Sequence, residues 1–195
     1  MSKLDEAIKF AIDAHSGQVR KITFNPYILH PLEVVAIAGT LTRDEDILCA
    51  AVLHDVVEDT EGTINEIREK FGNRVAELVS SETEDKHREL PPDVTWKRRK
   101  EESLAHLRAS EDIGAKVIWI SDKLSNVRSF YDAYVKMGDA LWNSFNQKDK
   151  NEQKWYYREV YKIVKPYFAD TLMFKEYEGL IQVLFGKEII DEIWK

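Results

Sequence analysis

Apolar side chains recur every three or four residues along most of the chain, which is the spacing of one face of an α-helix. The first such face consists of Leu4, Ala7, Ile8, Ala11 and Ile12. Similar spacing predicts helices over 64–71, 74–79, 94–108, 112–127, 133–146, 151–168 and 171–185, with a last turn over 187–194. The β-branched run 117–120 would also suit a strand, but the helical spacing on both sides favours a helix. The pattern predicts a compact, all-α fold.

Turn and capping residues place several helix ends. Pro31 suits the first turn of a second helix, whose predicted apolar face is Leu32, Val35, Ala36 and either Ala38 or Gly39. Asp44 is a predicted N-cap, and Thr63 with Glu66 matches a capping box. Gly72 is expected to end the helix that this box begins. Two polar segments, 15–29 and 81–93, are predicted loops.

One stretch, residues 48–60 (LCAAVLHDVVEDT), combines an apolar helix with four polar groups. Residues three and four apart are neighbours on a helix, so His54, Asp55, Glu58 and Asp59 are expected to share one patch. The negative end of a helix is a poor place for carboxylates, each costing about 0.3–1 kcal/mol. A divalent metal ion would offset that cost.

Composition narrows the class of protein. The 195 residues are 44% hydrophobic and 32% charged, which suits a single globular domain. A net charge of -7 argues against nucleic acid as a partner. The single cysteine, Cys49, excludes an internal disulfide and fits a reducing compartment. No signal peptide or run long enough to span a bilayer is apparent, so no membrane partner and a cytoplasmic location are expected. Oligomeric state is left open.

Further polar groups lie within apolar helices: His30, the pair His54–Asp55, and Asp122. A lone histidine there would usually be a hydrogen-bonded core residue, and buried ionised carboxylates are costly unless paired or metal-bound. Two imidazoles and two carboxylates suit Mn²⁺, Fe²⁺, Co²⁺ or Zn²⁺ better than Ca²⁺. The set could form a tetrahedral structural site, or a six-coordinate site with room for water and a phosphate oxygen.

These residues match the H…HD…D signature of the HD-domain metal-dependent phosphohydrolases. Further motifs carry the likeness: 15–21 (HSGQVRK), 26–32 (PYILHPL), 50–60 (AAVLHDVVEDT), 71–79 (FGNRVAELV) and 122–128 (DKLSNVR). Together they resemble the hydrolase domain of the RelA/SpoT family and the stand-alone small alarmone hydrolases. The resemblance covers about 4–130, which implies one hydrolase domain over 1–195 with a helical extension over about 131–195.

The resemblance also implies roles for individual residues. One Mn²⁺ would be held by His30, His54, Asp55 and Asp122. Glu58 and Asp59 match a catalytic acidic pair that positions or deprotonates the attacking water. The nucleotide would be approached by Arg20 and Lys21 in the loop and by Asn126, one helical turn beyond Asp122. Weaker candidates are Lys123 and Arg128, whereas Lys86 and the basic run 97–100 are better explained as solvated.

The implied reaction removes the 3′-pyrophosphate of ppGpp or pppGpp, alarmones of the stringent response, giving GDP or GTP and pyrophosphate. Relatives often carry a glycine near position 23, whereas the loop over 17–26 reads GQVRKITFNP here, which puts base selectivity in doubt. Two other enzyme activities stay open, a 5′-nucleotidase and an NADPH phosphatase. A non-catalytic nucleotide sensor of the same fold is a third alternative.

Overall fold

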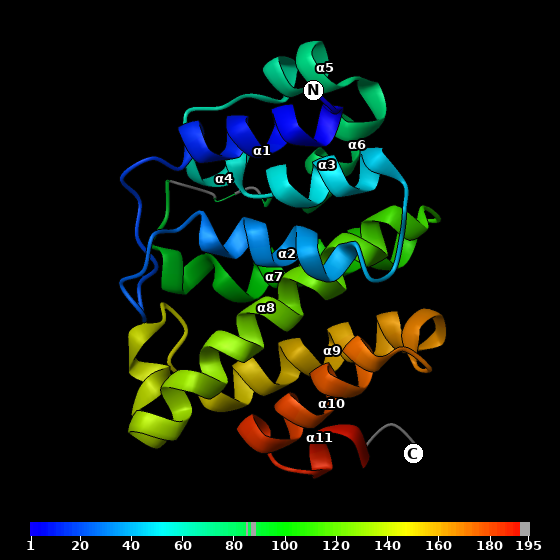
Figure 1. The fold of residues 1–195 in the computed structure, drawn as a ribbon. Coiled ribbons are helices and arrows are strands. Elements are labelled where there is room, and N and C mark those ends of the chain that lie inside the picture. The colour runs from blue at the N-terminus through cyan, green and yellow to red at the C-terminus, as the bar shows by residue number, and fades with distance from the viewer. Residues whose placement is uncertain (85, 87–88, 192–195) are drawn as a thin grey trace. The chain divides into compact units, whose positions relative to one another are not determined.

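The structure is a computed structural model that describes residues 1–84, 86 and 89–191 (Figure 1). Its elements are α1 (Lys3–Ala14), α2 (Leu29–Ala38), α3 (Glu45–Leu53), α4 (Val56–Asp59), α5 (Ile64–Phe71), α6 (Asn73–Glu82), α7 (Pro92–Ala109), α8 (Ile113–Met137), the 3₁₀ helix η1 (Gly138–Ser144), α9 (Lys150–Phe168), α10 (Leu172–Phe185) and α11 (Glu188–Asp191). Within these described ranges no strand forms, and the single β-bridge joins Val19 and Pro26. The prediction of an all-α fold is confirmed. Of the helices described, none is both long and apolar enough to cross a bilayer.

The chain divides into two compact units, each described here by itself. The first contains residues 1–20, 24–84 and 110–125, and the second contains 21–23, 85–109 and 126–195. In the first unit α3 packs against α1, α2 and α6, and Figure 1 shows it in cyan between α1 and α2. The five residues from Cys49 to Leu53 are fully buried. A helix that is apolar on all sides is expected at the centre of a core.

The second unit is built on aromatic packing. The rings of Tyr157 and Phe185 stack 5.7 Å apart, and Trp142 stacks on Phe185 at 5.1 Å. Nζ of Lys97 lies 3.2 Å from the centre of the Trp155 ring and 2.6 Å from Glu152. Part of the basic run 97–100 is therefore engaged in packing and ion pairing within this unit.

Most predicted helix ends are found. Asp44 caps α3, and Thr63 and Glu66 form both bonds of the capping box on α5. Gly72 ends α5 with a φ of 95°, a conformation that favours glycine. The strand alternative for 117–120 is wrong, because this run lies inside α8. The predicted apolar face of the second helix is only partly right: Ala38 is buried as predicted, but Ala36 is exposed, and Val34 and Ile37 are buried without having been predicted.

The sequence pattern predicts one helix over 48–60, but the structure divides this stretch. The helix α3 ends at Leu53, and a short helix α4 begins at Val56. Nδ1 of His54 lies 2.9 Å from the carbonyl oxygen of Ala51, the acceptor that a continuing helix would offer to the N–H of Asp55. Side chains that compete for backbone acceptors in this way interrupt helices. His54 and Asp55 consequently lie at a break between two helices.

The helix predicted over 133–146 is also divided. The helix α8 runs on to Met137, and residues 138–144 form the tighter 3₁₀ helix η1. Gly138 stands at the junction with a φ of 56°. The helix predicted over 112–127 and the start of the one predicted over 133–146 thus belong to one continuous helix of 25 residues.

Candidate metal centre

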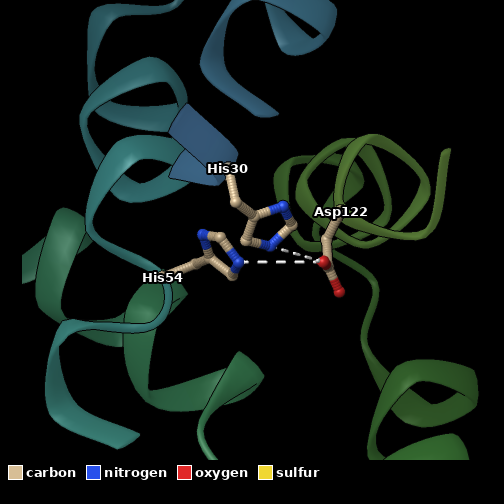
Figure 2. A group of neighbouring side chains, drawn as sticks. All are labelled: His30, His54 and Asp122. Atoms are coloured by element: carbon tan, nitrogen blue, oxygen red, sulfur yellow. Dashed lines mark ion pairs between the residues drawn. The ribbon is translucent and has the colours of Figure 1, made fainter. Parts of the chain in front are cut away.

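Three segments of the first unit bring two histidines and two aspartates together. His30 comes from the first turn of α2, Asp122 from the middle of α8, and His54 with Asp55 from the break between α3 and α4. Figure 2 shows the rings of His30 and His54 directed at the carboxylate of Asp122. Both histidines are buried, with 3% and 4% of their surfaces exposed. The helix break allows two adjacent residues to face the same point.

The donor atoms are spaced as ligands of one ion would be. Nε2 of His30 lies 3.1 Å from Oδ1 of Asp122 and 3.5 Å from Oδ2 of Asp55. Nε2 of His54 lies 3.8 Å and 3.1 Å from the same two oxygens. Two ligand atoms each about 2.1 Å from a metal are about 3.0 Å apart at a right angle and about 3.4 Å apart at a tetrahedral angle. Donor atoms of His30, His54 and Asp122 all lie within 4.8 Å of one another and could hold one metal ion, and Asp55 faces both histidines beside them.

The hydrogen bonding of His54 supports a cation at this point. Its Nδ1 donates to the carbonyl oxygen of Ala51, which can only accept, so Nε2 of the neutral ring carries a lone pair. That Nε2 is buried and makes no hydrogen bond, although an oxygen of Asp55 is 3.1 Å away. A lone pair that faces two carboxylates is repelled by them unless a positive charge lies between.

Charge and burial compete in this cluster. Burial lowers the pKa of His30, whereas at His54 the Asp55 and Asp122 carboxylates outweigh burial and raise the pKa to about 9. Burial opposes ionisation of both aspartates, yet their neighbours hold each pKa below its usual range. The chief neighbours are His54 for Asp55 and Lys123 for Asp122. The buried carboxylates of the metal-free site therefore favour a positive charge nearby. A proton on His54 provides that charge when no metal is bound.

A family model described as the HD domain matches residues 7–161 of the chain. The match covers most of the sequence and includes all four donors. The chain belongs to the HD-domain family. The predicted likeness to this family is confirmed, and a His–His–Asp cluster that could hold a metal ion is present.

Relatives of this HD domain carry names that concern ppGpp. A protein of Aquifex aeolicus named guanosine-3′,5′-bis(diphosphate) 3′-pyrophosphohydrolase is 30% identical over 87% of the chain, and SpoT of Escherichia coli, a bifunctional (p)ppGpp synthase/hydrolase, is 34% identical over 66%. The matched regions span only 26% and 18% of those proteins. A solved structure described as a metazoan ortholog of SpoT that hydrolyzes ppGpp superposes with a TM-score of 0.74, covering 94% of this chain and 96% of its own, at 24% identity. The likeness to that structure concerns the fold.

Neighbouring side chains orient the aspartates of the HD signature. Nζ of Lys123 contacts Oδ2 of Asp122, which leaves Oδ1 facing the histidines. The hydroxyl of Tyr27 donates to Oδ2 of Asp55 at 2.6 Å and lies 3.2 Å from Oδ2 of Asp59. Lys123, a weak candidate for nucleotide binding from the sequence, thus pairs with a residue of the cluster.

The predicted acidic pair lies in α4, next to the HD signature. Asp59 is exposed, and its carbonyl oxygen accepts a 2.7 Å hydrogen bond from Nε2 of Gln18. Glu58 is half-buried, and its Oε2 lies 3.4 Å from the backbone N–H of Glu84. Both acids belong to the first unit and follow the ligand candidate Asp55 by three and four residues.

The predicted nucleotide-binding residues are divided between the units. Arg20 belongs to the first unit, and its backbone N–H donates to the carbonyl oxygen of Asn25 at 2.9 Å. Lys21 and Asn126 belong to the second unit. Asn126 follows Asp122 by four residues in the continuous helix α8, as predicted.

Sequence reasoning missed three groups around the cluster. Ser125 and Glu33 form a hydrogen-bonded chain to Nδ1 of His30. Oε1 of Glu82 is buried without a hydrogen-bond partner, and burial raises the pKa of this carboxyl well above its usual value. Ser125 and Glu33 each follow a histidine or aspartate of the signature by three residues, so helical spacing could have revealed them. Glu82 had no comparable signal.

Proposed function

We propose that the chain is a metal-dependent phosphohydrolase that removes the 3′-pyrophosphate of ppGpp or pppGpp. The observation that carries the proposal is the cluster of His30, His54 and Asp122 beside Asp55, in which each histidine Nε2 lies 3.1–3.8 Å from an oxygen of both aspartates. A buried cluster in which two carboxylates face two histidines at this spacing needs a positive charge, and a metal ion would supply it. The proposed arrangement is one hydrolase domain over 1–195 with a core over about 4–130, located in the cytoplasm.

Mn²⁺ is the proposed metal, since two imidazoles and two carboxylates form a ligand set between soft and hard. When bound, the ion would supply Lewis acidity toward a phosphate oxygen and lower the pKa of water. The protein's own contribution is to hold the donors in place before the ion arrives. Lys123 and the hydroxyl of Tyr27 do so for the two aspartates.

The carboxylates of Glu58 and Asp59 are the proposed proton acceptors. As the oxygen of the attacking water forms a bond to the phosphorus on O3′, its proton passes to one of these carboxylates. The bond between phosphorus and O3′ breaks, so that pyrophosphate leaves and O3′ takes a proton. The Tyr27 hydroxyl contacts Oδ2 of Asp59, and Gln18 holds the backbone carbonyl of the same residue.

The choice of ppGpp or pppGpp as the substrate is based on the names of the relatives and on two cationic residues that precede His30 in the sequence. Arg20 presents a planar guanidinium, which suits stacking on a base or a paired grip on phosphate. Lys21 would add a second positive charge, and the amide of Asn126 could bond a ribose hydroxyl or a phosphate oxygen. The expected departure of loop 17–26 from the family pattern near position 23 makes the base the least constrained part of the proposal.

A nucleotide panel tests the proposal directly. The purified chain is assayed with Mn²⁺ and ppGpp, pppGpp, NADPH or a 5′-mononucleotide, and products are separated by anion exchange. Release of pyrophosphate with GDP or GTP is the expected result. Absence of pyrophosphate from both guanosine substrates would overturn the substrate assignment, and turnover of NADPH or the mononucleotide alone would favour the corresponding rival.

Matched histidine variants test the metal site. His54→Ala is expected to abolish Mn²⁺ binding and turnover, because it removes a buried donor. His106→Ala is the control, since His106 is exposed on α7 in the second unit. Equal Mn²⁺ binding by the two variants would rule out the assigned site.

A further inference from the structure

His30 makes contacts through both of its ring nitrogens, and a residue of α8 contacts each of them. Nε2 lies 3.1 Å from Oδ1 of Asp122, and Nδ1 lies 2.8 Å from Oγ of Ser125. Ser125 is 1% exposed, and its Oγ lies 2.7 Å from Oε2 of Glu33 on α2. Each helix thus contributes two residues three positions apart, and the four form one continuous contact between the helices.

The chemistry of these groups gives the chain of hydrogen bonds a direction. An ionised carboxylate can only accept, so the hydroxyl proton of Ser125 is donated to Glu33. Oγ of Ser125 is then left as an acceptor, and Nδ1 of His30 must carry the proton that it accepts. A neutral ring protonated at Nδ1 has its lone pair at Nε2, toward the cluster.

His54 reaches the same state by another route. Its Nδ1 donates to the backbone carbonyl of Ala51, an acceptor that no side-chain substitution removes. The direction at His30 depends instead on two side chains. Hydrogen-bond partners of this kind fix the ring orientation and the protonated nitrogen of metal-binding histidines, and their loss typically costs about 10–100-fold in metal affinity.

We propose that Glu33 and Ser125 are positioning residues that hold His30 in the form with a free Nε2 lone pair for the metal ion. The inference rests on the proposed metal site and goes beyond it, because it assigns an outer pair of residues to metal affinity. Glu33 acts through the Ser125 hydroxyl and needs no contact with the ion.

The most informative substitution is Glu33→Gln, which keeps the shape but adds an N–H₂ donor. The amide can then donate to Oγ of Ser125, and the serine hydroxyl can donate to Nδ1 of His30. Nε2 would carry the proton in that arrangement and could not bind a metal. Ser125→Ala removes the acceptor altogether, and Ser125→Thr restores it.

The experiment measures Mn²⁺ dissociation constants by calorimetry on the full chain without nucleotide. Glu33→Gln and Ser125→Ala are each expected to weaken binding at least tenfold, while Ser125→Thr and the exposed control Glu77→Gln stay within about threefold of the parent. The double variant is expected to bind no more weakly than Ser125→Ala, because the two residues act as one chain. A merely structural effect would instead add in the double variant.

The inference would be overturned by parental affinity in Glu33→Gln or by losses that add in the double variant. Loss of affinity in Ser125→Ala without rescue by Ser125→Thr would also overturn it. Failure of the proposed metal site itself would be seen separately, as Mn²⁺ binding that His54→Ala leaves unchanged.

Discussion

The hydroxyl of Tyr27 lies 2.6 Å from Oδ2 of Asp55, the same oxygen that faces both histidines. It also lies 3.2 Å from Oδ2 of Asp59. Burial and these carboxylates raise the pKa of Tyr27 far above its usual value, so the hydroxyl keeps its proton. Tyr27 therefore joins a proposed metal ligand to a proposed proton acceptor.

Tyr27→Phe is expected to lower kcat for ppGpp about tenfold at saturating Mn²⁺. The substitution leaves a carboxylate without its donor, which costs about 1–3 kcal/mol, and about 1.4 kcal/mol is a factor of ten. Steady-state kinetics measure kcat and KM, with Tyr131→Phe as the control. Tyr131 is 37% exposed and belongs to the second unit. Unchanged kcat in Tyr27→Phe would show that the link to Asp59 has no role in turnover.

Glu58→Gln and Asp59→Asn are expected to separate catalysis from metal binding. The proposed proton acceptor contributes about 10²–10⁴-fold, so the variant that removes it should lose kcat by that factor. The Mn²⁺ dissociation constant should change less than threefold, because neither side chain is among the four proposed donors. Kinetics and calorimetry are compared with those of Glu77→Gln. If both acidic variants keep full turnover, the proton acceptor lies elsewhere.

The stability of the metal-free protein should depend on pH through His54. Its pKa is raised to about 9 in the folded chain, above the usual value of about 6.5. The stabilisation is fully present below about pH 6.5 and is lost as pH rises through about 9. Urea unfolding between pH 6.5 and 9.5 should therefore show a decline that His54→Gln reduces. Identical pH slopes for the two proteins would contradict the assignment.

Chelation of the metal is expected to abolish turnover while most helices remain. The helix α3 is buried by α1, α2 and α6, and this packing needs no ion. Anion-exchange assays and far-UV circular dichroism, before and after EDTA, measure the two properties. Loss of helical signal together with activity would indicate a structural metal instead.

The helices could be predicted because their signals are local. The apolar spacing of 4–14 and the capping box at Thr63 and Glu66 fix the ends of α1 and α5 without reference to the rest of the chain. The break after Leu53 could not be read in the same way. It depends on a side-chain bond from His54 to the backbone, which competes with the helix and leaves no periodic trace.

The sequence indicates the residues of the proposed metal site but not the residues that hydrogen-bond to them. His30 and Asp122 were named from a motif, although 92 positions separate them in the sequence and only the fold places their atoms 3.1 Å apart. Helical spacing places Ser125 near Asp122 and Glu33 near His30, but it does not show that these two residues, 92 positions apart in the sequence, contact each other. This hydrogen bond depends on how the fold brings α2 and α8 together, which a single sequence does not specify.

The Nδ1 atoms of the two histidines have hydrogen-bond partners of different kinds, a backbone carbonyl for His54 and a side-chain hydroxyl for His30. The partner of His54 is the main chain at Ala51, which every substitution at that position retains. The partners of His30 are two side chains, open to replacement one at a time. If the proposed chain of hydrogen bonds operates, descendants of this protein could change their metal requirement through positions 33 and 125 while all four ligands stay the same.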